Sequence, residues 1–302
     1  MAKRSNPPQR NMSRISQLLS NAGLGLKKSL GQNFLVNEGA LRKIAEAASG
    51  GKDTLVVEVG AGLGNLTEQL AERNGRVISV ELDERFKALH QRELGHLQNI
   101  FFHYGDFLEI DLESLIAPHL EAKEGEARLH FVGNIPYHIT SPILFKLIES
   151  SLDIDCICLL MQREVGHRLA ARRGSKHYGI LAIKAAVKYE AKMVFTISPG
   201  SFLPPPKVHS SLVKLTPRPD GPLLDTTADI HAFFNYIDAA FSQRRKFLSR
   251  SLANGSKGRI SRESIISALE QSSFKETVRA EELSPEEHVQ LYHTLDRPKL
   301  ET

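Results

Sequence analysis

Cysteine is scarce in this sequence, and its scarcity excludes several classes of protein. Cys156 and Cys158 are the only two cysteines, and both lie in the apolar run Ile154–Met161, which predicts a strand. We therefore expect neither a disulfide framework nor a cysteine-ligated zinc site, and the usage is typical of a reducing, cytoplasmic compartment. The 12 histidines form no H-x-x-x-H pair, so no metal site is expected either.

Long apolar stretches are also missing. No run of about twenty apolar residues occurs, so we expect no transmembrane helix. The chain has 302 residues, of which 41% are hydrophobic and 25% charged, as is ordinary for a globular protein. This length is enough for one or two domains with a large core.

Acidic residues are missing from two long stretches, although the net charge is only +4. Residues 1–37 carry six basic side chains and no acidic one, and residues 241–262 carry seven and no acidic one. Between Arg163 and Lys192, eight basic residues face two acidic ones. Solvated surface explains any one cluster, but three together favour a nucleic-acid partner. The basic arm over residues 1–26 suits a disordered RNA-binding segment and a transit peptide equally well.

Strand and helix patterns alternate through the first two thirds of the chain. The predicted strands are Thr54–Val59, Arg76–Glu81, Asn99–Tyr104, Leu129–Val132, Ile154–Met161, Val187–Thr196 and Ser210–Leu215. The predicted helices follow Asn37, cover Leu66–Arg73, Asp83–Leu94 and Arg163–Arg172, and start once more at Ser141 as cap with Pro142. This alternation is typical of a doubly wound α/β sheet.

After Pro217 the pattern becomes wholly helical. Helices are predicted over Ile230–Leu252, Arg262–Leu269 and Pro285–Leu295, and the prolines and Gly221 within 217–222 predict a linker. We therefore expect three parts: a basic N-terminal arm over 1–26, an α/β domain over 27–217 and a small all-helical domain over 223–302.

A glycine loop joins the first predicted strand to its helix. Gly60, Gly62 and Gly64 follow that strand, and Glu81 ends the next one. Glycines at this turn let a ligand approach the backbone, and a carboxylate at the next strand end can bind both ribose hydroxyls of a nucleoside. On this pattern the ligand is either NAD or S-adenosylmethionine. Asp106, after the third strand, is placed to accept from an adenine amino group.

The tetrapeptide Asn134-Ile135-Pro136-Tyr137 follows the fourth predicted strand, at the sheet edge where such folds bind ligands. An adenine amino group is a poor nucleophile because its lone pair is delocalised into the ring. Hydrogen bonds from the amine to the Asn134 side-chain oxygen and the Ile135 carbonyl would favour a pyramidal nitrogen. Pro136 fixes the backbone that carries this carbonyl, and Tyr137 can stack on a flipped-out base.

Asn134–Tyr137 resembles the catalytic motif of class I adenine-N6 methyltransferases, and further motifs narrow the resemblance. Residues 27–35 (KKSLGQNFL), 134–142 (NIPYHITSP), 199–208 (PGSFLPPPKV) and 241–246 (FSQRRK) are similar to motifs of the ribosomal RNA adenine N6,N6-dimethyltransferase family, of the bacterial KsgA type. The resemblance covers nearly everything from Leu18 to Leu295. Asn37 and His209 stand where this family commonly has Asp, and neither touches the expected chemistry.

The resemblance implies a Rossmann-like class I methyltransferase sheet with a small all-helical C-terminal domain, and S-adenosylmethionine as cofactor. The implied cofactor-binding residues are Asn33, Leu35, Gly60, Gly62, Glu81, Asp106 and Asn134. The implied catalytic residues are Asn134, Ile135, Pro136, Tyr137 and Phe202, and Phe202 would sandwich the target base opposite Tyr137. We expect Phe202 to be exposed because its loop is rich in proline. The implied RNA-binding residues are Lys27, Lys28, Arg244, Arg245 and Lys246.

The function implied in this way is dimethylation of the N6 amino groups of two adjacent adenosines near the 3′ end of small-subunit 16S rRNA. The expected partner is that rRNA within a pre-30S particle, and the protein is expected to be a cytoplasmic monomer without membrane contact. One alternative is a macrolide-resistance (Erm) type methyltransferase of large-subunit rRNA, against which the helical-domain motif 243–246 argues. A second is a non-catalytic ribosome-assembly or transcription factor, and a third is an NAD-dependent oxidoreductase. The intact tetrapeptide with Glu81 disfavours the second, and the G-x-G-x-G spacing and basic clusters disfavour the third.

Overall fold

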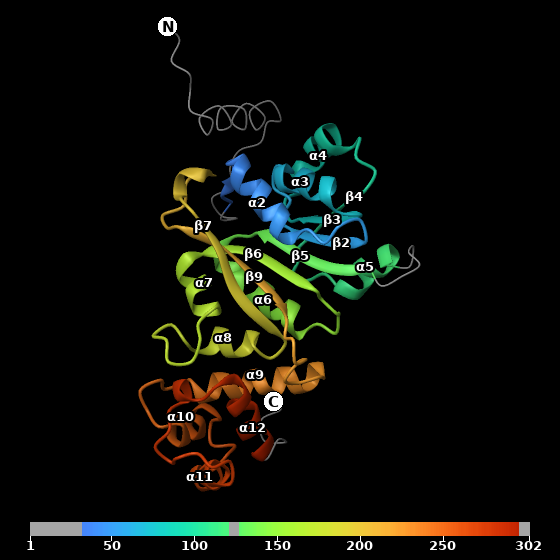
Figure 1. The fold of residues 1–302 in the computed structure, drawn as a ribbon. Helices are drawn as coiled ribbons and strands as arrows, with labels where there is room; N and C mark the ends of the chain where they lie inside the picture. The colour runs from blue at the N-terminus through green and yellow to red at the C-terminus, as the bar shows by residue number, and fades with distance from the viewer. Residues whose placement is uncertain (1–31, 121–126, 296–302) are drawn as a thin grey trace. The chain divides into compact units, whose positions relative to one another are not determined.

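The computed structural model describes residues 32–120 and 127–295, and its contacts divide the chain into two compact units (Figure 1). Unit 1 consists of the described residues of Met1–Leu144, Leu152–Gly166 and Met193–Leu215. Unit 2 consists of those of Phe145–Ser151, His167–Lys192 and Thr216–Thr302. The sequence-based division at 217–223 stays a prediction, and the basic arm over 1–26 lies outside the described residues.

A seven-stranded sheet in the order β4-β3-β2-β5-β6-β9-β7 is the framework of the fold. Its strands are β2 (Thr54–Val59), β3 (Arg76–Glu81), β4 (Ile100–Tyr104), β5 (Arg128–Asn134), β6 (Cys156–Gln162), β7 (Tyr189–Ile197) and β9 (Ser210–Pro217). Strands β2 to β6 pair in parallel, whereas β9 pairs antiparallel with β6. All seven predicted strands are present within two residues of their predicted ends. The predicted α/β sheet is therefore confirmed.

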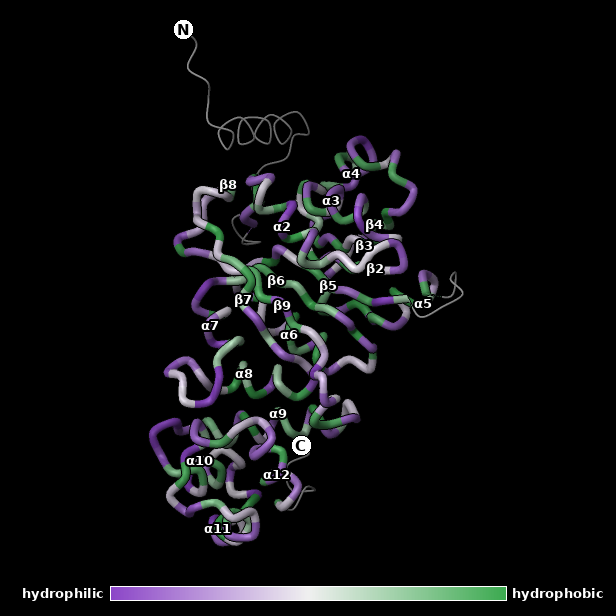
Figure 2. Tube along the Cα trace, in the orientation of Figure 1, coloured by the Kyte–Doolittle hydropathy of each residue, from purple (hydrophilic) through white to green (hydrophobic). Residues whose placement is uncertain are grey.

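The central strands are buried on both faces. Every residue of β2 is buried, and β5 and β6 are buried over nearly their whole length. The hydrophobic residues of β5 and β6 give the green stretches at the middle of the sheet in Figure 2. Because neighbouring side chains of a strand point to opposite faces, such continuous burial requires cover on both sides. On one face this cover comes from α2 (Glu38–Ala48) and α3 (Asn65–Arg73), whose apolar residues share one core with the sheet.

The other helices of the described residues range from 6 residues in α8 to 14 residues in α9. They are α4 (Lys87–Leu94), α5 (Leu112–Leu120), α6 (Thr140–Glu149), α7 (Arg163–Leu169), α8 (Ile180–Ala185), α9 (Thr227–Ala240), α10 (Leu248–Gly255), α11 (Arg262–Gln271) and α12 (Pro285–Thr294). Asn37 caps α2 as predicted, because its side chain accepts from the Ala40 N–H at 3.0 Å. None of these helices has the length and apolar character that crossing a membrane requires.

Four helix predictions are wrong in detail. The helix predicted over Asp83–Leu94 starts as a 3-10 turn over Glu84–Phe86 before α4, and the one predicted over Arg163–Arg172 ends at Leu169. The helix predicted over Ile230–Leu252 is interrupted after α9, because the Ser251 side chain accepts from the Gln243 N–H and the Ser251 carbonyl accepts from the Ser242 hydroxyl. These local hydrogen bonds stabilise a turn between α9 and α10 instead of a continuous helix. Ser141 is not a cap, since α6 already begins at Thr140, directly after a short 3-10 turn.

Three features were not predicted. Helix α5 carries Pro118 near its end, and α8 is only 6 residues long, so neither gives a clear helical pattern. A separate two-stranded sheet pairs β1 (Phe34–Leu35) with β8 (Phe202–Leu203). Strands of two residues leave no periodicity in a sequence, and this pair joins segments that are far apart along the chain.

Candidate active site

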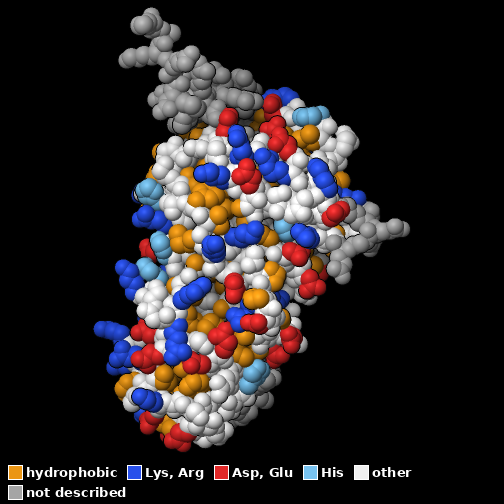
Figure 3. All heavy atoms as spheres, viewed as in Figure 1, with side chains coloured by type: hydrophobic (Ala, Val, Ile, Leu, Met, Phe, Trp, Pro, Cys, Tyr) orange, Lys and Arg blue, Asp and Glu red, His pale blue; other side chains and the backbone are white. Residues whose placement is uncertain are grey.

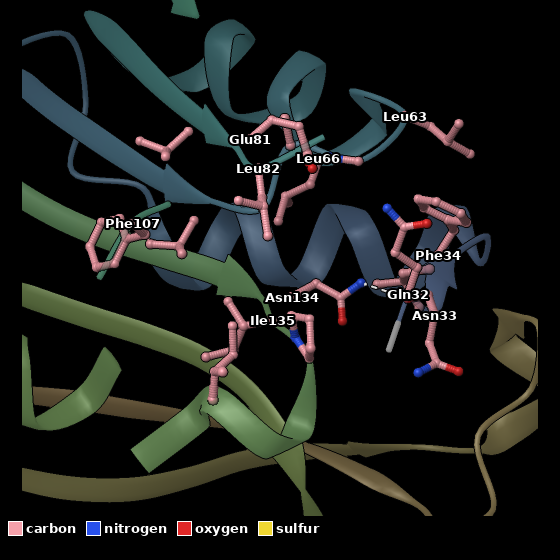
Figure 4. Close-up of a pocket in the computed structure, with 18 of the residues that line it drawn as sticks. Gln32, Asn33, Phe34, Leu63, Leu66, Glu81, Leu82, Phe107, Asn134 and Ile135 are labelled. Atoms are coloured by element: carbon pink, nitrogen blue, oxygen red, sulfur yellow. Dashed lines mark hydrogen bonds between the residues drawn. The ribbon is translucent and has the colours of Figure 1, made fainter. Parts of the chain in front are cut away.

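A pocket lies at the carboxyl edge of the sheet, beside the neighbouring strands β2 and β5 (Figure 4). After β2 the chain continues to β3 on one side of this pair, and after β5 it continues to β6 on the other side. The crevice at the point where the strand order reverses is the usual ligand site of open α/β sheets. The pocket holds about 1090 Å³ of space, part of it open to solvent. Among the sequence-predicted residues, its wall contains Asn33, Leu35, Gly60, Gly62, Glu81, Asp106, Asn134, Ile135, Pro136 and Tyr137.

The glycine loop after β2 needs glycine for its backbone. Gly60 has φ +86° and Gly62 has φ +54°, a region that other residues rarely adopt. A Cβ on Gly62 would stand 3.2 Å from ring carbons of Phe34, which itself lines the pocket. The loop therefore brings bare backbone to the pocket wall, as the sequence predicted.

Glu81, at the end of β3, is held by the loop. Its Oε2 accepts from the Gly62 N–H at 2.7 Å and its Oε1 accepts from the Asp83 N–H at 2.9 Å. The backbone of Leu82 also hydrogen-bonds the carboxylate. A carboxylate has about four acceptor positions, so one remains for a ribose hydroxyl. Burial raises the pKa of Glu81, so its charge depends on these hydrogen bonds.

Two further side chains that line the pocket, one acidic and one apolar, are suited to a nucleobase. Asp106 is exposed, and its Oδ1 accepts from the Leu108 N–H at 2.9 Å. Leu82, which follows Glu81, is 50% exposed and lines the same pocket (Figure 4). A large exposed apolar side chain beside a carboxylate offers a flat base an apolar surface. Sequence reasoning missed Leu82, although its place directly after Glu81 could have indicated it.

Asn134 has a fixed amide orientation. Its Nδ2 donates to the Asn33 carbonyl at 3.1 Å, which Figure 4 shows as a dashed line. A carbonyl only accepts, so this bond places the amide nitrogen toward Asn33 and directs Oδ1 away from it. Asn134 thus presents an acceptor oxygen at the end of β5.

The three residues after Asn134 also line the pocket. Pro136 has φ −56° and starts a 3-10 turn, in which the Ile139 N–H donates to the Pro136 carbonyl at 3.2 Å. The Tyr137 hydroxyl is hydrogen-bonded to the Ser210 Oγ at 2.6 Å, and burial raises its pKa. The half-buried ring of Tyr137 is therefore anchored to β9 while it lines the pocket.

Phe202 is not where the sequence analysis expected it. Its side chain is 1% exposed and belongs to the core that α2 and α3 share with the sheet, so the predicted exposure is wrong. The physical reason is that Phe202 lies opposite Leu35 in the β1–β8 pair, which turns the ring inward. A ring so buried does not stack on a base in this conformation, and Phe202 does not line the pocket.

Glu58 is a buried carboxyl beneath the site that sequence reasoning missed. It lies in β2, and its Oε2 accepts from the hydroxyls of Thr67 at 2.5 Å and Ser79 at 2.6 Å. Its Oε1 is buried and has no hydrogen-bond partner among the described residues. Burial raises the pKa of Glu58 from 4.5 to about 7. The acidic residue two positions before Gly60 was visible in the sequence.

The raised pKa of Glu58 predicts a pH-dependent stability. Between pH 4.5 and about 7 the folded state holds a proton that the unfolded state has lost, so the free energy of unfolding falls as the pH rises through this window. The full decline corresponds to about 3 kcal/mol. Glu58→Gln, which keeps a neutral acceptor for Thr67 and Ser79, should abolish this part of the decline. Urea unfolding of both proteins, followed by circular dichroism at pH 5 and pH 8, measures it, and parallel pH profiles would contradict it.

The predicted RNA-binding residues fall into two groups. Lys27 and Lys28 lie outside the described residues. Arg244, Arg245 and Lys246 lie in the turn after α9 and are exposed. Arg244 also donates to Glu281 at 2.6 Å and to the carbonyls of Lys176 and Tyr178, so it ties the turn to the segment before α8 within unit 2.

The groups that line the pocket fit S-adenosylmethionine. Glu81 has an acceptor position left for a ribose hydroxyl, the glycine loop allows close approach, and Leu82 and Asp106 offer contacts to an adenine ring. The side-chain oxygen of Asn134 is an acceptor that faces the same pocket. A sheet of this order with this pocket defines a Rossmann-like class I methyltransferase that uses S-adenosylmethionine.

Comparisons with known proteins narrow the class. Residues 23–296 match the family model described as Ribosomal RNA adenine dimethylase, and the chain belongs to that family. It is 39% identical over 288 residues to Ribosomal RNA small subunit methyltransferase A of Latilactobacillus sakei subsp. sakei, with 95% of each chain covered. It is 38% identical over 291 residues to the protein of the same name from Staphylococcus aureus, with 96% of each chain covered.

Solved structures agree with this assignment. The structure of the 23S rRNA methyltransferase ErmE matches with a TM-score of 0.62 at 27% identity, over 87% of this chain and 100% of that chain. A dimethyladenosine transferase from Plasmodium falciparum matches with a TM-score of 0.69 at 26% identity, over 85% of this chain and 95% of that chain.

Proposed function

We propose that this protein dimethylates the N6 amino groups of two adjacent adenosines near the 3′ end of small-subunit 16S rRNA, within a pre-30S particle. The relatives named as small-subunit methyltransferases support the substrate. The observation that carries the proposed chemistry is the hydrogen bond from Asn134 Nδ2 to the Asn33 carbonyl. It directs the Asn134 oxygen away from Asn33, where it can accept from an incoming amine.

The proposed mechanism rests on hydrogen bonding to that amine. Bound S-adenosylmethionine supplies a methyl group on an activated sulfonium. In the first transfer, Asn134 Oδ1 and the Ile135 carbonyl would accept from the two amine protons, one of which is lost when the new N–C bond has formed. In the second transfer, one of these two acceptors would bind the single remaining proton. Both arrangements favour the pyramidal geometry of the attacking nitrogen. Because these acceptors are positioned in advance, they stabilise the transition state more than the planar ground state. Pro136 holds the Ile135 carbonyl in place.

The target adenosine must leave its stack to reach the pocket, because the pocket opens at the sheet edge. A base flipped into such a site is usually held by stacking on an aromatic side chain. Tyr137 serves this purpose in our proposal, since its hydroxyl is anchored at Ser210 and its ring lines the pocket. Phe202 has no part in this arrangement.

The proposed substrate can be tested by subunit choice. Purified small and large ribosomal subunits that lack methylation are incubated with the protein and S-adenosylmethionine labelled in its methyl group. We expect label in the small-subunit rRNA and none in the large-subunit rRNA. The reverse distribution would assign the large-subunit alternative, and no label in either subunit would contradict the proposal.

Phosphate contacts by the turn after α9 form part of the proposal. Figure 3 shows Lys and Arg side chains gathered at the edge of unit 2 beside α10. Arg245 and Lys246 are exposed, and Arg244 holds the turn in place through Glu281 and two carbonyls.

Monomeric action in the cytoplasm, where bacterial ribosomal subunits are assembled, belongs to the same proposal.

The two exposed residues of this turn should determine the salt dependence of RNA binding. The double variant Arg245→Ala with Lys246→Ala should make the negative slope of log affinity against log salt shallower by about 1.5, since each phosphate contact contributes roughly 0.7–0.9. Filter binding to small subunits over a salt series measures this. The control, Lys52→Ala with Arg92→Ala, removes two exposed charges from unit 1. Equal slopes in the two double variants would contradict a specific role of the turn.

A further inference from the structure

We propose that His90 is a positioning residue of the cofactor pocket, which fixes the glycine loop through the carbonyl of Gly62. The inference rests on the proposed use of this pocket. His90 lies in α4, is 1% exposed, and does not line the pocket itself. Its Nε2 is 2.9 Å from the Gly62 carbonyl oxygen and its Nδ1 is 2.9 Å from the Tyr104 hydroxyl.

The two hydrogen bonds determine the state of the imidazole. A carbonyl oxygen only accepts, so Nε2 carries the proton and donates to Gly62. In a neutral ring Nδ1 then accepts, and the Tyr104 hydroxyl donates to it. Burial lowers the pKa of His90, which agrees with a neutral ring near pH 7. Tyr104 therefore selects the tautomer of His90 that can hold the loop.

Gly62 is thereby held on both sides. Its N–H donates to Glu81 Oε2 at 2.7 Å, and its carbonyl, which belongs to the next peptide unit, accepts from His90. One side chain thus fixes each of the two peptide planes that meet at Gly62. Without His90 this carbonyl would lose its partner, and the loop would gain conformations in which the Gly62 N–H no longer meets Glu81.

Ring stacking keeps the imidazole in place. The His90 ring stacks on Phe102 with centroids 4.4 Å apart, and on Phe86 with centroids 6.0 Å apart. Phe86 in turn meets Phe34, the pocket residue whose ring covers Gly62. His90 therefore joins α4 to the pocket wall through rings as well as through hydrogen bonds. It acts on ligand affinity by holding Gly62, and it touches neither ligand nor substrate.

Cofactor affinity of full-length variants tests the proposal. His90→Leu keeps apolar bulk and removes both hydrogen bonds, and we expect it to bind S-adenosylhomocysteine about 10-fold more weakly, as the loss of two ordinary hydrogen bonds implies. His90→Gln places an amide donor near the former Nε2, and its affinity should lie within about threefold of the wild type. The matched control is His96→Leu, the same change at an exposed position, which should bind as the wild type does.

The readouts separate a positioning role from a merely structural one. Calorimetry gives the affinities, and steady-state kinetics should show a raised KM for S-adenosylmethionine with kcat within about twofold of the wild type. If His90→Leu fails to fold, Tyr104→Phe replaces it, because it keeps the ring and removes only the hydroxyl. A roughly threefold weaker affinity of Tyr104→Phe supports the proposal.

Three results would overturn the proposal. They are wild-type affinity of folded His90→Leu, equal losses in His90→Leu and His90→Gln, and unchanged affinity of Tyr104→Phe where it is the substitute. Each of these leaves the proposed function intact, because the wild type still binds the ligand. A wild-type protein that fails to bind S-adenosylhomocysteine would overturn the proposed function and this inference together.

Discussion

Asn134→Ala should lower kcat for methyl transfer by about 100-fold or more, the range for removing one preorganised hydrogen-bonding group from a transition state. The physical reason is that the Asn134 oxygen accepts from the amine most strongly when the nitrogen becomes pyramidal. Affinity for ribosomal subunits should change little, since Asn134 is one small side chain in a pocket, whereas RNA affinity comes mostly from phosphate contacts. Single-turnover methylation at saturating cofactor, together with filter binding, measures both quantities.

A matched control for this variant is Asn37→Ala. Asn37 is also an asparagine of unit 1, but its side chain caps α2. Its loss should cost about 1 kcal/mol of stability and leave kcat near the wild-type value at a temperature where the protein is folded. A wild-type single-turnover rate in Asn134→Ala would show that the catalytic group lies elsewhere.

Glu81→Ala should weaken cofactor binding by about 1.5–3 kcal/mol, which is roughly 10- to 150-fold in the dissociation constant. The variant removes an acceptor for a ribose hydroxyl and also the partner of the Gly62 N–H. Because burial raises the pKa of Glu81, wild-type affinity should also fall as the pH is lowered through that pKa, where the carboxylate gains a proton.

Calorimetric titration with S-adenosylhomocysteine at pH 8 and pH 5 checks both statements about Glu81. The control is Glu84→Ala, which removes an exposed carboxylate three residues further along the chain. Unchanged affinity in Glu81→Ala would remove Glu81 from the cofactor site. Tight binding of NAD by the wild type would contradict the account of the protein as a methyltransferase.

The centre of the sheet could be predicted from the sequence because its central strands are buried on both faces. Continuous apolar runs such as Thr54–Val59 are bounded by glycine and polar residues, and each run appears as a strand within two residues. The site residues at strand ends followed from the same pattern, since Gly60, Glu81 and Asn134 come directly after or at the ends of neighbouring strands. Parallel strands bring their carboxyl ends to one edge, so the predicted alternation of strands and helices was enough to place these residues at the same edge.

The errors come from contacts that the local hydrophobic pattern does not reveal. The burial of Phe202 follows from its pairing with Leu35, which neither local sequence reveals. Likewise, nothing in the pattern of α4 distinguishes His90 from an ordinary core residue until its position against Gly62 is known. The break between α9 and α10 depends on hydrogen bonds from Ser242 and Gln243 to Ser251, a residue eight to nine positions away.

The most direct test of the account is mass spectrometry of nucleosides from small-subunit rRNA. Methylation-deficient small subunits are incubated with the protein and methyl-labelled S-adenosylmethionine, and the rRNA is then digested to nucleosides. We predict labelled N6,N6-dimethyladenosine at two per subunit with the wild type. At the time when the wild type first reaches this value, we expect about one hundredth of it or less with Asn134→Ala. Labelled nucleosides other than methylated adenosine, or the same yield with Asn134→Ala, would contradict the account.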